Sequence, residues 1–261
     1  MENSGTVRVE QIDAIALITL DRPEKHNALS QSMRDSLIRK LGELAADETV
    51  RVVVLTGAGK VSFCVGTDVS EFLGRSGLTQ WERDIDPFRL FELIERFPKP
   101  VLAMINGYAY GGGCELALAC DIRISSTNSQ FGQLEVNFGL IPGGGGTQRL
   151  TRLVGRGQAM RMILGGERIP ASEAWRIGLV DLLVPPTDLW ETTFSVARAI
   201  AERNPVAVRL AKEAIRSVDE MSLSAGLRYE ASLMGICLYE SGSEATISAF
   251  LGKKGGGEQS T

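Results

Sequence analysis

The sequence predicts an α/β core followed by a helical C-terminal part. In the first half, short runs rich in β-branched residues alternate with longer segments of helical periodicity. After about residue 147 most of the chain has helical periodicity, broken by a strand-like run at residues 178–184. The 261 residues are 44% hydrophobic and 23% charged, which is typical of a globular protein with one large core.

The first elements are two strands and a helix. Residues 7–12 and 14–20 are rich in β-branched side chains and predict strands joined by a turn. A polar loop follows, and Ser30 stands where a helix N-cap is expected. The helix runs to about Ala46. Its predicted apolar stripe consists of Met33, Leu37, Leu41 and Leu44.

The next elements alternate in the same way. A loop begins at Phe63, a helix covers about residues 88–97, and three glycines precede a short buried helix at residues 114–119. Residues 52–55, 101–105 and 122–125 predict buried strands, and residues 196–203, 206–218 and 223–239 predict helices.

Composition and charge exclude several classes of function. The net charge of −4 argues against a nucleic-acid partner. The first ten residues lack the apolar segment of a secretory signal, and no window approaches the ~20 apolar residues of a membrane span. Four cysteines without a CxxC pair, and a single histidine, argue against a metal site. We therefore expect a cytoplasmic protein with reduced thiols.

Two glycine-containing segments offer backbone amides to a ligand. Gly66 lies in a loop after a strand, where it is either an ordinary turn residue or a device that turns an amide into a cavity. Residues 111–113 are glycines at a strand-to-helix junction, where exposed amides favour negative charge. Close helix packing is the alternative explanation for these three glycines.

Two glutamates stand in apolar surroundings. Glu115 is followed by four apolar residues, so we expect it to be buried with a raised pKa, unless it only complements the helix dipole. Glu135 lies among apolar residues ahead of the glycines at 143–146, and an ordinary paired or exposed carboxylate is its alternative. Two such carboxyl groups suit general acid/base chemistry.

Other catalytic schemes lack their residues. The glycine runs are not followed by the Lys-Ser/Thr of a phosphate loop, nor do they fit a dinucleotide fingerprint. The only histidine, His26, lies in a polar loop, and there is no G-x-S-x-G segment, so a Ser-His-Asp hydrolase is not supported.

Residues 111–117 and 141–150, in this order and spacing, resemble the crotonase superfamily and within it the enoyl-CoA hydratases. The resemblance extends over nearly the whole chain. It implies a spiral of ββα units in residues 1–195 and a helical trimerisation region in residues 196–261. It also implies a homotrimer or homohexamer.

The resemblance implies a hydro-lyase that adds water reversibly across the 2,3 double bond of an enoyl-CoA. Glu115 would help to deprotonate the attacking water, and Glu135 would deliver a proton to Cα. The amides of Thr67 and Gly112 would form the oxyanion hole, and that of Gly143 would place the water. The residues implied to contact the substrate or its CoA are Lys25, His26, Val65, Thr67, Asp68, Val69, Ser70, Gly112 and Lys253.

Coenzyme A is expected only as part of the substrate, with no permanently bound cofactor and no membrane partner. Val65 and Thr67 stand where alanines are frequent in the family, and Leu134 replaces a frequent proline, which leaves the acyl group open. The pathway, whether fatty acid, amino acid or aromatic degradation, is open too. An enoyl-CoA isomerase or another acyl-CoA lyase is the alternative reading, and a non-catalytic or RNA-binding relative is a third.

Overall fold

Two β-sheets form the framework of the first part of the chain in the computed structural model. The larger sheet has the strand order β1-β2-β3-β5-β7-β10, and the smaller has the order β4-β6-β8-β9. Among the described strands, β1 pairs antiparallel with β2 and β9 pairs antiparallel with β8, and the other neighbours are parallel. The larger sheet contains β1 (Thr6–Ile12), β2 (Ile15–Asp21), β3 (Val52–Gly57), β5 (Val101–Ile105), β7 (Ile122–Ser126) and β10 (Leu182–Val184), and the smaller contains β4 (Ser62–Cys64), β6 (Tyr108–Tyr110), β8 (Gln130–Gly132) and β9 (Ile169–Pro170).

The chain winds through these sheets in repeated ββα units. The pairs β3–β4, β5–β6 and β7–β8 each place their first strand in the larger sheet and their second strand in the smaller. Helices α3 (Pro87–Glu95), α4 (Gly112–Ala119) and α5 (Gly146–Val154) follow these pairs in turn, and the 3-10 helix η3 (Glu135–Phe138) precedes α5. The predicted α/β class with a ββα spiral is confirmed.

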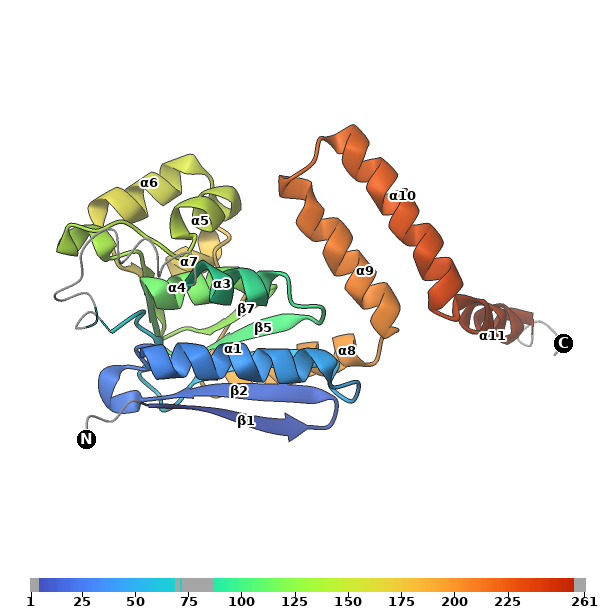
Figure 1. Ribbon diagram of the computed structural model, residues 1–261, viewed down its shortest axis with the longest axis horizontal. Helices are drawn as coiled ribbons and strands as arrows, with labels where there is room; N and C mark the ends of the chain where they lie inside the picture. Colours follow the sequence, from blue (N-terminus) through green and yellow to red (C-terminus); the bar gives the residue numbers. More distant parts are fainter. Residues whose placement is uncertain (1–4, 69–70, 72–86, 256–261) are drawn as a thin grey trace, which may run out of the picture. The chain divides into compact units, whose positions relative to one another are not determined.

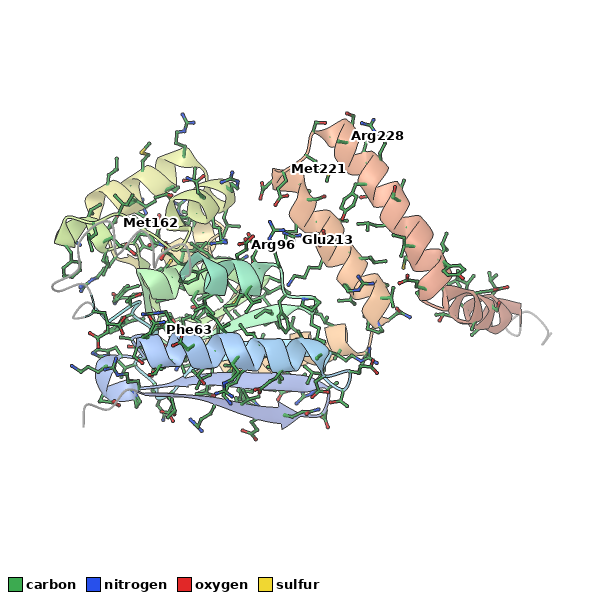
Figure 2. All side chains as sticks on the ribbon, in the orientation of Figure 1. Phe63, Arg96, Met162, Glu213, Met221 and Arg228 are labelled. Atoms are coloured by element: carbon green, nitrogen blue, oxygen red, sulfur yellow. The ribbon has the colours of Figure 1, made fainter. Side chains whose placement is uncertain are left out.

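Helix α1 (Gln31–Ala46) follows the prediction closely. The Ser30 hydroxyl accepts a hydrogen bond from the Met33 amide at 3.3 Å, so Ser30 is the N-cap. The four side chains of the predicted stripe are buried. They belong to one hydrophobic core with strand residues such as the fully buried Phe63 (Figure 2). The core therefore fixes the strands whose ends carry the glycine runs.

Three strands of the smaller sheet differ from the sequence prediction. Strand β4 begins at Ser62 and extends into the loop that the sequence suggests from Phe63, and β6 and β8 occupy segments without a predicted element. Each strand has three residues, too few to show a period-2 pattern. Helix α4 also begins at Gly112, earlier than the expected residue 114, because its first two residues are glycines, which carry no helical signal.

The structure describes residues 5–68, 71 and 87–255, and it divides the chain into two units, Met1–Ala199 and Ile200–Thr261. The predicted boundary after residue 195 and the observed one both lie within α8 (Leu189–Ala201). None of the described helices combines the length and apolar character that a membrane span requires. The remaining helices are η1 (Pro23–Lys25), α6 (Arg156–Gly165), α7 (Ala171–Arg176), α9 (Pro205–Arg216), η4 (Ser217–Asp219), α10 (Leu223–Glu240) and α11 (Ser243–Gly255) (Figure 1).

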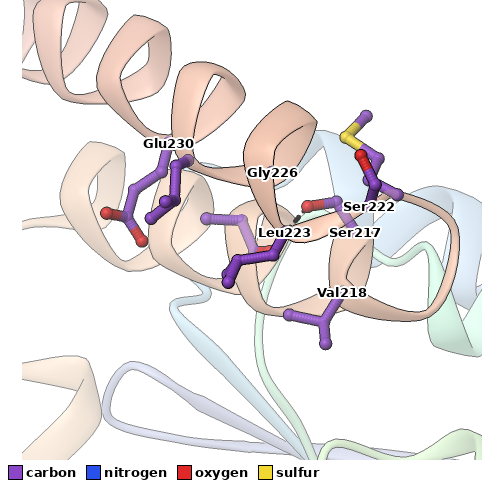
Figure 3. Close-up of a pocket in the computed structure, with 9 residues that line it drawn as sticks. Ser217, Val218, Ser222, Leu223, Gly226 and Glu230 are labelled. Atoms are coloured by element: carbon purple, nitrogen blue, oxygen red, sulfur yellow. Dashed lines mark hydrogen bonds between the residues drawn. The ribbon is translucent and has the colours of Figure 1, made fainter.

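The second unit is helical throughout its described part and carries one notable hollow. A depression of about 320 Å³ lies where η4 meets the start of α10 (Figure 3). Its lining includes Val218, Met221, Leu223 and Leu227, all exposed. None of the residues that line this hollow belongs to the glycine runs or is one of the two glutamates.

Candidate active site

The glycine run before α5 closes around Glu115. Glu115 lies in the first turn of α4 and is only 3% exposed. Its Oε1 accepts hydrogen bonds from the amides of Gly144 and Gly146, both at 2.8 Å. Between them Gly145 has a φ of +102°, a conformation that suits glycine and lets both flanking amides turn to one oxygen.

Glu135 approaches the start of α4 from η3. A Cβ on Gly111, the residue before α4, would lie 3.0 Å from Oε1 of Glu135. The buried side-chain amide of Gln133, with its nitrogen turned to the carboxylate, lies 3.2 and 3.3 Å from the two oxygens of Glu135. The helix that carries Glu115 therefore also receives the carboxyl group of Glu135 at its N-terminal end.

Burial raises the pKa of both carboxyl groups, and their other neighbours differ. Burial raises the pKa of Glu115, and the amides of Gly146 and Gly144 and the charge of Arg149 oppose this. Burial and the nearby charge of Glu115 raise the pKa of Glu135 to about 7. The expected raised pKa of Glu115 is confirmed. The amides and Arg149 favour the carboxylate of Glu115, whereas the Glu115 charge favours the protonated form of Glu135, a difference that suits a proton acceptor and a proton donor.

Two backbone amides lie side by side next to this pair. The Leu29 amide donates to the carbonyl of Gly66 at 2.7 Å, and the Leu29 carbonyl accepts from the amide of Asp68 at 3.3 Å. In this parallel bridge the N–H of Thr67 points away from Leu29. A Cβ on Gly112 would lie 3.5 Å from the Thr67 nitrogen, and one on Gly66 would lie 2.9 Å from the Gly112 nitrogen.

A buried ion pair holds the segment that presents the Thr67 amide. The Arg22 guanidinium contacts the Asp68 carboxylate at 2.9 Å, with side chains 7% and 19% exposed. Asn27 fixes the loop that contains Arg22, because its side chain accepts from the Arg22 amide and donates to the carbonyls of Ala58 and Ser62. Arg22 therefore anchors the segment that contains Thr67 and Asp68, and Asn27 anchors the loop that contains Arg22.

The other predicted contact residues have varied positions. Gly143 directly precedes the amide that binds Glu115. Lys25 and His26 are exposed around the end of η1, and His26 Nδ1 lies 3.1 Å from the Ser62 hydroxyl. Val65 is half-buried next to Gly66. Val69 and Ser70 lie outside the described residues, and Lys253 belongs to α11 in the second unit, where its side chain is not described.

Sequence reasoning missed four contributors to this site: Gln133, Gly144, Gly146 and Arg149. The glycines at 143–146 are visible in the sequence, but nothing there says that their amides are directed at Glu115. Gln133 sits two residues before Glu135 among apolar neighbours, which is a weak signal for a buried partner. Among the described residues no group of three or more His, Cys, Asp or Glu side chains is arranged to hold a metal ion.

A ββα spiral that brings two carboxyl groups and two backbone amides to one helix N-terminus is the arrangement that the crotonase superfamily implies. Residues 10–256 match the family described as enoyl-CoA hydratase/isomerase. The chain belongs to this family, and the prediction of an enoyl-CoA hydratase-type enzyme is confirmed.

Individual relatives are similar over nearly their whole length. The short-chain-enoyl-CoA hydratase of Clostridium acetobutylicum is 40% identical, with 96% of each chain covered. The crotonyl-CoA hydratase of Syntrophomonas wolfei is 37% identical, covering 94% of this chain and 95% of the relative. The crystal structure of the enoyl-CoA hydratase from Bacillus anthracis is 38% identical, with a TM-score of 0.90 and 95% and 96% of the two chains covered.

Proposed function

We propose that this chain adds water reversibly across the 2,3 double bond of an enoyl-CoA thioester. The observation that carries the proposal is the position of two carboxyl groups at one end of α4: Glu115 lies in its first turn, and Glu135 approaches Gly111, the residue before it. Isomerases and other branches of the family often lack one of these two acids, so the presence of both favours hydration. The similarity to relatives named as hydratases supports it.

In this mechanism Glu115 takes a proton from the attacking water, and Glu135 gives a proton to the substrate. Oε1 of Glu115 is held by two amides, and Oε2 accepts a proton from the water whose oxygen bonds to Cβ. Glu135, protonated below about pH 7, gives its proton to Cα. The substrate gains one water, and transfer of the proton from Glu115 to Glu135 through solvent restores the enzyme.

The paired amides stabilise the charge that develops on the substrate. We infer that the N–H groups of Thr67 and Gly112 donate to the thioester oxygen as the enolate forms, a contribution of about 3–4 kcal/mol per donor in comparable sites. The Gly143 amide orients the attacking water. A hydrogen-bond donor placed in advance is effective because it needs no reorganisation during the reaction.

Substrate and location are further parts of the proposal. The names of the two similar relatives, short-chain-enoyl-CoA hydratase and crotonyl-CoA hydratase, favour a short acyl group. We assign contacts with the substrate and its coenzyme A, which enters only as part of that substrate, to the residues implied by the resemblance. A cytoplasmic location and a role in fatty acid metabolism stay predictions. The assigned residues are Lys25, His26, Val65, Asp68, Val69, Ser70 and Lys253.

Substitution of each glutamate tests the reaction. We expect Glu115→Gln and Glu135→Gln to lower kcat for hydration of crotonyl-CoA at least about 100-fold, because each variant loses one proton-transfer step. The assay follows loss of the ultraviolet absorbance of the conjugated thioester. Glu191→Gln, on an exposed carboxyl group of α8, is the matched control and should keep wild-type activity.

Wild-type activity in either variant with a native fold by circular dichroism would exclude the two-glutamate mechanism. If instead a 3-enoyl-CoA gains the conjugated absorbance and no hydroxyacyl product forms, the chain is an isomerase.

A further inference from the structure

Arg149 stands behind the loop that holds Glu115 without touching that glutamate itself in any described hydrogen bond. It lies in α5, where its own amide donates to the carbonyl of Gly145 at 2.8 Å. Its Nη1 donates to the carbonyl of Gly144 at 2.8 Å, and its Nη2 donates to Oε2 of Glu95 at 2.7 Å. The side chain is 18% exposed, so the guanidinium is largely withdrawn from water.

Gly144 connects this guanidinium to the candidate catalytic carboxyl group. Its carbonyl accepts from Arg149, while its amide donates to Oε1 of Glu115 at 2.8 Å. The backbone of Gly144 thus links the Arg149 guanidinium to the Glu115 carboxyl group through two hydrogen bonds. The space is closed, because a Cβ on Gly144 would lie 2.4 Å from the Phe91 ring and 2.7 Å from Oε2 of Glu115.

The ion pair contributes little to folding, because Glu95 is 37% exposed and water screens its charge. What the fork-shaped guanidinium adds is direction, since it bonds two acceptors at a fixed angle. One acceptor, Glu95, belongs to α3 and lies 54 residues before Arg149, and the other, Gly144, lies in the loop before α5.

We propose that Arg149, oriented by Glu95, is a positioning residue of the active site: it fixes Gly144 so that the amides of Gly144 and Gly146 hold Oε1 of Glu115 and leave Oε2 to the water. The inference rests on the proposed hydration and adds to it the device that aims the proton acceptor. It assigns a role to a residue that the glycine run and the glutamate pair leave unexplained.

The charged groups around Glu115 determine how Arg149 and Glu95 affect the pKa of Glu115. Arg149 faces it from α5, Glu135 from η3, and the thiol of Cys114 lies on its own helix. Phe91 from α3 brings no charge. Arg149 is the positive group in this set, and Glu95 partly neutralises it. Removal of Arg149 should therefore raise the pKa of Glu115, and removal of the Glu95 charge should lower it.

Two substitutions with opposite effects test this inference. Arg149→Met should lower kcat roughly 10- to 100-fold, with little change in KM, because the proton acceptor is misaligned. It should also move the acidic limb of the pH profile of kcat/KM to higher pH. Glu95→Gln should move that limb to lower pH. Arg149→Lys keeps the positive charge but loses the planar guanidinium. The acidic limb of its kcat/KM profile should therefore stay near that of wild type, while its kcat should be low.

Arg152→Met is the matched control. It removes an exposed guanidinium from the same helix, one that bonds only Gln148 in its described hydrogen bonds, and it should change neither kcat nor the limb. A merely structural role for Arg149 would lower activity equally at all pH values. Wild-type kcat in Arg149→Met, or a limb that moves in the same direction in Arg149→Met and Glu95→Gln, would overturn the inference.

A second measurement separates this inference from the proposed function. Titration of ¹³C-labelled glutamate by NMR, with the Glu115 signal assigned by its loss in Glu115→Gln, follows the carboxyl group without any turnover. Opposite shifts in the two variants support the Arg149 device even if wild type hydrates no enoyl-CoA, an outcome that would reject only the reaction. If Arg149→Met fails to fold, Glu95→Gln and Arg149→Lys still decide, and an unmoved signal in Glu95→Gln overturns the inference.

Discussion

Glu135 makes folding depend on pH. Its pKa rises from 4.5 to about 7 on folding because burial and the Glu115 charge disfavour the carboxylate. The folded state therefore binds more protons than the unfolded state between these values. The stabilisation is complete below about pH 4.5 and is lost as the pH rises through about 7.

The substitution Glu135→Gln removes this titration. At about 1.4 kcal/mol per pKa unit, discounted for partial exposure of the side chain, we expect Glu135→Gln to gain about 2 kcal/mol over wild type between pH 5 and pH 8.5. Urea unfolding at fixed protein concentration measures both proteins. Glu191→Gln should track wild type at both pH values. An equal difference between Glu135→Gln and wild type at the two pH values would contradict the assigned pKa.

Single residues show how far sequence reasoning reaches. Glu115 and Glu135 were identifiable because a carboxyl group in an apolar stretch is unusual. Arg22 and Arg149 were not, since an arginine in a loop or a helix is ordinary and their partners Asp68 and Glu95 lie 46 and 54 residues away. Such pairings arise from the tertiary fold, so the residues that aim the catalytic groups are harder to predict than the groups themselves.

At the scale of elements, periodicity determined what could be predicted. Helix α1 and strands β3 and β5 are long enough to show their apolar pattern. The predicted ends of α1 and β5 agree with the observed ones, and β3 extends two residues beyond its predicted end at residue 55. The three-residue strands of the smaller sheet carry no such pattern. Their backbone pairing is fixed by neighbouring strands, which a local sequence does not describe.

The glycine run before α5 allows an element-scale prediction. Gly144→Ala would place a methyl group against Phe91 and Glu115, so we expect a destabilisation of about 1–3 kcal/mol and a large loss of kcat. Gly143→Ala is the matched control for stability, because nothing lies within 4 Å of a Cβ there. Thermal unfolding compares the two variants. Equal melting temperatures would mean that the close approach at Gly144 is not required.

At the scale of the whole molecule, the second unit exposes many large apolar side chains along its helices. Exposed apolar surface that gathers in a patch marks a protein interface. We infer that this unit joins copies of the chain into the homotrimer or homohexamer that the resemblance implies. The most exposed of these side chains are Ile215, Val218, Leu223, Tyr239, Phe250 and Leu251.

A charge at this surface should separate the subunits. Leu223 is 80% exposed and lines the hollow between η4 and α10, so Leu223→Lys, combined with Val218→Lys, places two ammonium groups where an apolar contact is expected. Desolvating unpaired charges is costly, and we expect light scattering after size exclusion to change from about three or six chain masses to one. Val9→Lys, on edge strand β1 of the first unit, adds a charge elsewhere and should leave the assembly intact. A double variant that stays assembled at micromolar concentration would show that copies meet through another surface.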